Sequence, residues 1–82
     1  MAIFKFYYRI GKYEIFGLFI ESEEEVTKFL GNKVHILGYD IFLSDINVIR
    51  LSTDADYIEM FEQLVGGKWF GINPLDYIDL YE

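Results

Sequence analysis

Residue types that commonly carry enzyme chemistry are scarce in this chain. It has no cysteine and a single histidine, His35, among its 82 residues. The absence of cysteine excludes disulfide bonds and thiolate metal sites, and it fits a reducing compartment. With no cysteine nucleophile and no serine in a triad-like setting, nucleophilic catalysis has no support. No metal-ligand cluster or phosphate loop is evident, so the sequence predicts no enzyme activity and no cofactor.

Long apolar runs are also missing. No stretch approaches the roughly 20 apolar residues that a membrane-spanning helix requires. Lys5 and Arg9 interrupt the N-terminal apolar run, so this run does not read as the core of a signal peptide. No repeat, linker or low-complexity segment occurs. We therefore expect a single cytoplasmic domain over residues 1–82, with no membrane association.

Basic residues are few outside the N-terminal segment. The formal net charge is −7, yet residues 1–20 carry three bases against one acid. The remaining residues carry four bases against thirteen acids. A basic footprint is needed for binding nucleic acid or anionic membranes, so this distribution argues against both. It favours solubility and a basic protein partner.

Aromatic residues are abundant, at 20% of the chain, and compensate for the small core that so short a domain can bury. Residues 3–10 and 13–20 are rich in β-branched and aromatic types, which favours two strands. Gly11 and Lys12 between them suit a type II′ turn, because its first position needs a positive φ. The predicted cross-strand pairs on one face are Ile10–Tyr13, Tyr8–Ile15, Phe6–Gly17 and Phe4–Phe19, and those on the other are Arg9–Glu14, Tyr7–Phe16, Lys5–Leu18 and Ile3–Ile20.

Residues 22–30 have the pattern of a short helix. Ser22 and Glu25 have the spacing of a capping box, and Gly31 is a natural helix stop. Beyond it, residues 33–37, 39–43 and 46–51 read as strands. The number of strands in this region is two or three, because Gly38 is compatible with a turn between two strands or with a bulge inside one bent strand.

A second helix is predicted from about residue 54 to residue 65. Ser52 or Thr53 is expected to cap it, and Gly66 and Gly67 are expected to end it. Residues 68–72 read as an extended link or an edge strand. Asn73 and Pro74 then open a terminal helix that is expected to continue to Tyr81. The order is ββα, two or three strands, then αα. This order predicts an α+β fold in which an antiparallel sheet of four to five strands carries two to three short helices mainly on one face.

The acidic C-terminal part is the strongest functional signal. From residue 51 onward, Lys68 is the only base. If the two C-terminal helices are neighbours, their carboxylates form one anionic surface with interspersed tyrosines, which supply contact area at low entropic cost. The alternative is a solvated helix face whose acids favour the helix dipole. The candidate partner-binding residues are Asp54, Asp56, Tyr57, Glu59, Glu62, Asp76, Tyr77, Asp79 and Tyr81.

Other features have competing interpretations. The carboxylate pairs Asp54/Asp56 and Asp76/Asp79 do not match a calcium-loop pattern. His35 in a strand is more typical of a structural residue than of a catalyst. Trp69 and Phe70 either plug the open end of the core or form an exposed anchor. The patch formed by Tyr7, Phe16 and Leu18 is either covered by helices or free to bind a second copy or another partner.

Two functional hypotheses follow. The first is a small acidic inhibitor of the immunity or anti-defence type, which mimics nucleic acid and places its anionic surface on a basic, nucleic-acid-binding enzyme. Its general type, small, acidic and cysteine-free, is common among such proteins. The second is a non-enzymatic interaction module that self-associates through the N-terminal hairpin. A small enzyme remains a third reading, and it requires a pocket that brings His35 against a carboxylate.

Overall fold

The N-terminal hairpin forms the centre of the sheet. In this computed structural model, which describes residues 1–77, β1 (Ala2–Ile10) pairs with β2 (Tyr13–Glu21) in an antiparallel arrangement. Every predicted cross-strand pair is present, from Ile10 opposite Tyr13 to Ile3 opposite Ile20. Gly11 has a φ of 60°, as the first position of a type II′ turn requires. The register predicted from burial of the Phe4 and Phe6 face is therefore confirmed.

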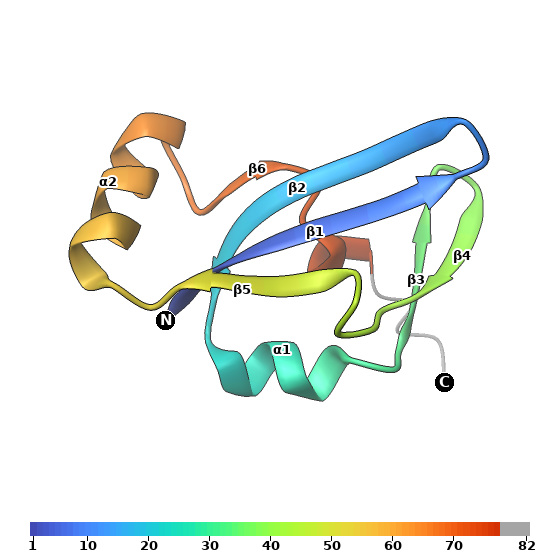
Figure 1. The fold of residues 1–82 in the computed structure, drawn as a ribbon, viewed down its shortest axis with the longest axis horizontal. Helices are drawn as coiled ribbons and strands as arrows, with labels where there is room; N and C mark the ends of the chain where they lie inside the picture. Colours follow the sequence, from blue (N-terminus) through green and yellow to red (C-terminus); the bar gives the residue numbers. More distant parts are fainter. Residues whose placement is uncertain (78–82) are drawn as a thin grey trace.

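Two further strands extend this hairpin into a four-stranded antiparallel sheet. The strand order is β5-β1-β2-β6, with β5 (Val48–Ser52) beside β1 and β6 (Trp69–Gly71) beside β2 (Figure 1). Residues 68–72 thus include an edge strand. Gly17 in β2 allows the segment after β6 to approach β2 closely, because a Cβ at residue 17 would overlap the carbonyl oxygen of Ile72.

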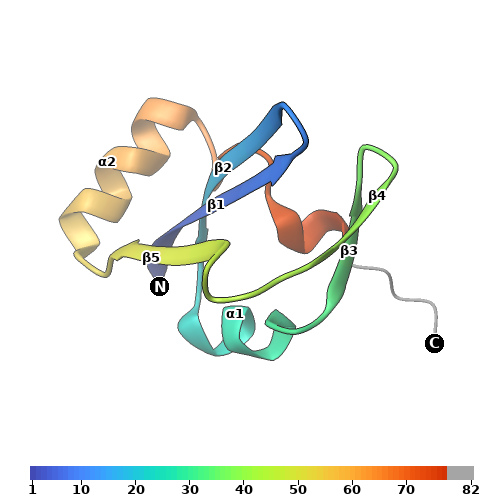
Figure 2. The same cartoon turned by 45° about the vertical axis from the view of Figure 1, so that its right-hand side comes forward.

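A separate two-stranded hairpin accounts for the region around Gly38. β3 (Lys33–Ile36) and β4 (Tyr39–Phe42) are antiparallel and are joined by Leu37 and Gly38, whose φ values are 53° and 83°. Positive φ at both central positions is the signature of a type I′ turn. Residues 33–51 therefore contain three strands, and Gly38 lies in a turn. Figure 2 shows this hairpin at the end of the molecule away from α2 (Ala55–Val65).

The first helix, α1 (Glu23–Phe29), starts as predicted but with half of a capping box. The Ser22 hydroxyl accepts a hydrogen bond from the Glu25 backbone N–H at 3.1 Å. The reciprocal bond is absent. The Glu25 carboxylate instead accepts from Lys28 at 3.2 Å, and the Ser22 N–H donates to the Glu21 carboxylate at 3.1 Å.

The cap of α2 differs from the prediction of Ser52 or Thr53. Asp54 is the N-cap, and its carboxylate accepts hydrogen bonds from the N–H groups of Asp56, at 2.9 Å, and Tyr57, at 3.2 Å. A carboxylate satisfies the free N–H groups as a hydroxyl would and also complements the helix dipole. The Ser52 hydroxyl accepts a hydrogen bond from the backbone N–H of Asp54, the cap residue itself.

The segment after β6 is a short 3-10 helix, η1 (Pro74–Tyr77). The Asn73 side chain accepts a hydrogen bond from the Leu75 N–H at 3.1 Å, so the predicted start is confirmed. The rest of the predicted terminal helix, including Asp79 and Tyr81, lies outside the described residues.

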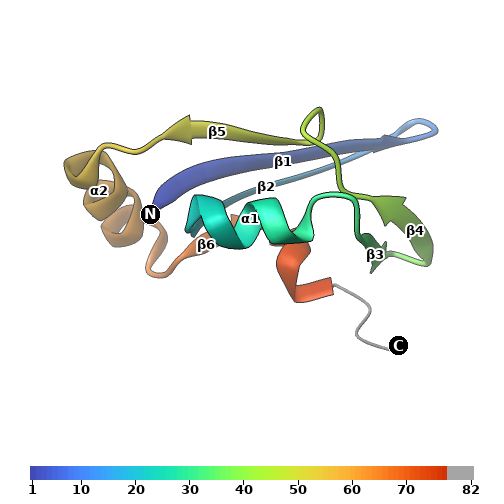
Figure 3. The same ribbon diagram turned by 90° about the horizontal axis from the view of Figure 1, so that it is seen from below.

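The two faces of the sheet pack differently, and we define them by their residues. The first face, with Phe4, Phe6 and Phe19, is covered by α1, η1 and the β3–β4 hairpin (Figure 3). The Phe4 and Phe19 rings stack with centroids 5.6 Å apart. The second face carries the alternate residues, and α2 packs on it only at one end, where Ile58 and Phe61 meet Ile3 and Ile20. The predicted α+β class is confirmed, with α2 as the helix on the opposite side from the other two.

Within residues 1–77, no helix combines the length and apolar character needed to cross a membrane.

Candidate partner-binding surface

The acids of α2 are not neutralised by neighbouring side chains. Asp56 and Glu59 are exposed, and Glu62 is half-buried. Among the described residues the ion pairs are Lys28–Glu25, His35–Asp40 and Arg50–Glu23, none of which involves α2. The last turn of α2 also contains no base. The helix therefore presents carboxylates that have no ion-pair partner among the described residues.

Two of the three bases of the N-terminal hairpin, Arg9 and Lys12, lie far from α2. Lys5 and Lys12 sit over the rings of Tyr7 and Tyr13, each with its nitrogen 5.8 Å from the ring centroid. The Arg9 side chain donates a hydrogen bond to the Gly11 carbonyl at 3.2 Å. Figure 1 shows the hairpin turn and α2 at opposite ends of the molecule. Arg9 and Lys12 are thus separated in space from α2, whereas Lys5 lies opposite Leu18 on the second face.

The structure separates the two groups of acids that the sequence analysis combined. Asp76 and Tyr77 belong to η1, where the adjoining Leu75 packs into the core of the first face. The helix α2 packs on the second face and reaches η1 only through β6. Asp54, Asp56, Tyr57, Glu59 and Glu62 therefore lie together on α2 and its cap, and Asp76 and Tyr77 lie apart from them on η1. Asp79 and Tyr81 are not among the described residues.

An apolar groove runs beside α2 on the second face. Its volume is about 520 Å³. The floor contains buried or half-buried side chains, namely Ile3, Leu18 and Phe61. The rim contains Leu51, Tyr57, Met60 and Leu64, which are exposed by 53%, 60%, 53% and 80%.

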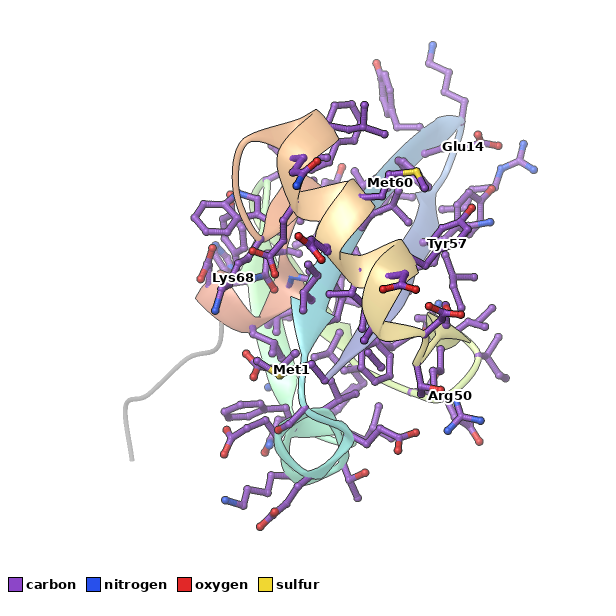
Figure 4. All side chains as sticks on the ribbon, turned by 90° about the vertical axis from the view of Figure 1, so that its left-hand side faces the viewer. Met1, Glu14, Arg50, Tyr57, Met60 and Lys68 are labelled. Carbon is purple, nitrogen blue, oxygen red and sulfur yellow. The ribbon has the colours of Figure 1, made fainter. Side chains whose placement is uncertain are left out.

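The groove borders Asp56 because of helical spacing. Tyr57, Met60 and Leu64 are three and four residues apart and form one stripe along α2. Asp56 stands one turn before Met60, on the side of the stripe that faces solvent. Figure 4 shows Tyr57 and Met60 on one side of α2 and Lys68 on the other. Asp56 and the apolar stripe thus share one surface, whereas Glu59 projects from another side of α2.

The apolar character of the second face continues beyond the groove. Phe16, Ile49 and Phe70 are all exposed, while Tyr7 and Leu18 are half-buried. Phe70 lies directly opposite Leu18, so its side chain is on this face. The Tyr7, Phe16 and Leu18 patch is therefore open along most of its length, since α2 covers only the Ile3 and Ile20 end.

Of the two interpretations of Trp69 and Phe70, the one in which they plug the core is wrong. Both side chains are more than half exposed. They lie on the edge strand β6, which pairs over only three residues with β2, and the core opposite is already filled by Phe6 and Phe19. The sequence analysis also missed Met60 and Leu51. The spacing of Tyr57, Met60 and Leu64 was the available signal, as a second apolar stripe beside the one containing Ile58.

His35 does meet a carboxylate, but not in a pocket. Its Nδ1 lies 2.9 Å from the Asp40 carboxylate across the β3–β4 hairpin, and both side chains are more than 60% exposed. The hydrogen bond with His35 holds the pKa of Asp40 below its ordinary value, with a smaller contribution from the charge of Lys33. Solvent surrounds the pair, so it gives no enclosed site for acid–base chemistry.

Metal binding has no geometric support in the part of the chain described. Residues 1–77 contain no group of three or more potential metal ligands. Of the carboxylate pairs considered, Asp54 is committed to capping α2, and Asp76 belongs to the separate η1 segment.

Comparison with protein-family models, curated proteins and solved structures found no match to this chain, so a functional conclusion depends on its own residues.

Proposed function

We propose that this chain is a non-enzymatic protein antagonist that binds a basic partner through α2 and the groove beside it. The observation that carries the proposal is the combination of unpaired carboxylates and an exposed apolar stripe on one helix. Acidic side chains confer selectivity and rapid association with a basic surface, and apolar contacts supply the affinity.

The chemistry of the carboxylates suggests the class of partner. Proteins that bind nucleic acid carry clustered lysine and arginine to neutralise phosphates. Exposed carboxylates on a rigid helix present fixed negative charges to such a cluster. Occupation of a nucleic-acid channel by α2 would block the enzyme without any reaction on this chain. The proposed partner is therefore a basic enzyme that acts on nucleic acid.

The experiment is affinity capture from the native cell extract with three forms of the protein. The test variant is Asp56→Lys with Glu59→Lys. The control is Glu24→Lys with Asp45→Lys, which changes the net charge equally on exposed residues of other elements. Glu24 occupies the same position in the first turn of α1 as Asp56 in α2, so the cost to the helix dipole is matched.

The expected result is a basic enzyme captured by the wild type and the control and lost with the test variant. Its activity should fall when the wild type is added in equimolar amount. Because exposed charges are screened over about 8 Å at physiological ionic strength, capture should weaken as salt rises. Equal capture of that enzyme by all three forms would contradict the proposal.

A second candidate is self-association through the open second face. The exposure of Phe16, Ile49 and Phe70 favours it, because apolar patches of this kind occur at interfaces. The net charge of −7 opposes it, since two copies repel each other. Analytical ultracentrifugation at two salt concentrations separates the candidates: a dimer insensitive to salt supports self-association, and a monomer supports the antagonist.

A further inference from the structure

We propose that the groove beside α2 receives a basic amphipathic helix of the partner, which lies on the second face of the sheet alongside α2. This proposal rests on the function proposed above and adds the kind of structural element that the site binds. It follows from the shape of the groove, the position of its apolar residues and the charge on its rim.

The uncovered surface is a sheet face, and this restricts its occupant. A strand would add to an edge of the sheet, at β5 or β6, and would leave the face exposed. A face is covered by a helix or by another sheet, and α2 already supplies one helix on this side. A helix packed beside α2 would complete the layer.

The stripe on α2 fits this arrangement. Tyr57, Met60 and Leu64 lie along the side of α2 that faces the groove, and the sheet residues Leu18 and Leu51 line the same space. A helix with apolar residues at positions i, i+3, i+4 and i+7 would contact both walls at once. The volume of about 520 Å³ is within the range of roughly 300–1,000 Å³ for sites that enclose much of a ligand.

The charge of the occupant follows from the rim. Asp56 is exposed next to Met60 on α2 and has no ion-pair partner among residues 1–77, and Glu59, on another side of the helix, adds to the negative charge of α2. Lysine or arginine on the flank of an incoming helix would pair with Asp56. A second copy of this chain does not meet this requirement with its own α2, because that helix contains no base. The complementary ligand is a separate basic amphipathic helix.

The probe for the test is a synthetic helical peptide of about four turns, composed of leucine and lysine at the spacing of an amphipathic helix. Two reference peptides accompany it, one with glutamate in place of lysine and one with serine in place of leucine. Binding to the full chain is measured by fluorescence anisotropy at low and high salt. We expect the leucine–lysine peptide to bind at least tenfold more tightly than either reference.

The matching protein variant is Met60→Gln with Leu64→Gln. Both side chains are more than half exposed, and glutamine is a good helix former, so the fold should be retained. The control is Ile46→Gln, an apolar residue in the loop before β5 that is as exposed as Leu64. The double variant should bind the leucine–lysine peptide at least tenfold more weakly, while the control should bind it as the wild type does.

Equal binding of the leucine–lysine peptide to the wild type and the double variant would overturn the proposal. A dimer of the protein alone that is lost in the double variant would also overturn it, because the groove would then hold a second copy. Failure of the proposed function would give a different result: the partner enzyme would be captured equally well by the wild type and by the variant in which Asp56 and Glu59 are replaced by lysine. If capture depends on those acids but not on Met60 and Leu64, the proposed function stands and only the proposal of a helix bound in the groove is refuted.

Discussion

Leu37 is the one residue other than glycine with a positive φ within residues 1–77. Its φ of 53° is in the left-handed region, where an L-residue with a Cβ is disfavoured by roughly 1–2 kcal/mol. The type I′ turn requires this conformation and prefers Asn followed by Gly. The side chain is 72% exposed, so it contributes little packing in return.

Leu37→Asn should therefore stabilise the protein by about 0.5–1 kcal/mol. For a domain of this size the melting temperature should rise by about 3–6 °C. Leu37→Ala is the control, since it removes the same apolar side chain without the preference of Asn for this conformation. If the Asn variant melts at no higher temperature than the Ala variant, the backbone at residue 37 is not strained as described.

Asp40 gives a prediction with a defined pH direction. Its pKa is held below 3.8, first by the hydrogen bond with His35, so its ionised form is favoured in the folded protein. The resulting stabilisation is present above pH 3.8 and is lost as the pH falls through the lowered pKa. An NMR titration of the Asp40 carboxyl group should show a lower pKa in the wild type than in His35→Ala. Identical values would exclude His35 as the cause.

Phe6 is one of the largest fully buried side chains of the core. It is fully buried, as is Phe19, on the first face of the sheet. Phe6→Ala should cost about 3–5 kcal/mol, because it removes a large apolar side chain and leaves a cavity. The exposed Phe42, on β4, provides the comparison. In urea denaturation Phe42→Ala should change the free energy of unfolding by less than about 1 kcal/mol, and an equal loss in both variants would be inconsistent with the described burial.

At the scale of the elements, the close approach of residue 72 to β2 fixes where the C-terminal segment runs. Gly17 faces Gly71 in the pairing of β2 with β6, and the Ile72 N–H donates to the Phe16 carbonyl at 3.1 Å. A Cβ on Gly17 would overlap backbone atoms of Ile72, and backbone cannot turn aside as a flexible side chain does. This contact positions η1 under the first face, away from α2.

Gly17→Ala should therefore destabilise the protein by about 2–3 kcal/mol. Gly67→Ala is the matched control, because its φ is not in the left-handed region and a Cβ there meets nothing within 4 Å. The control should leave the free energy of unfolding unchanged or raise it by up to about 1 kcal/mol. Similar losses in the two variants, measured by urea denaturation, would show that β6 does not lie against β2 as described.

How far the sequence predicts each element depends on whether the determining interaction is local. The β1–β2 register was predictable, because a two-residue turn and the alternation of Phe4, Phe6 and Phe19 agree on it. The cap of α2 was missed because Ser52, Thr53 and Asp54 are three competent caps in succession. Trp69 was misplaced because its exposure depends on what else fills the core, which local pattern does not contain.

The candidate site was predicted in part for the same reason. The acids of α2 were identified from composition and helical spacing, both of which are local. Their separation from Asp76 depends on the crossing of β6 at Gly17, a contact between distant segments. The groove also required the structure, because Leu18, Leu51 and Met60 come from three elements.

At the scale of the whole molecule, charge and apolar surface are unevenly distributed. The end with α2 combines unpaired carboxylates with an apolar groove, whereas the opposite end carries Lys12 and the Leu37 turn (Figure 1). The first face is closed by helices and a hairpin, and the second is open over most of its length. This asymmetry underlies the proposal that one end of the molecule binds a partner.

The most direct test is hydroxyl-radical footprinting of the protein alone and in complex with the enzyme that it captures. Tyr57 and Met60, at the groove, should be oxidised severalfold more slowly in the complex. Tyr13 and Tyr39, which are comparably exposed near the opposite end, should be oxidised at unchanged rates and serve as internal references. Protection confined to Tyr13 and Tyr39, with Tyr57 and Met60 oxidised equally in both states, would contradict the account.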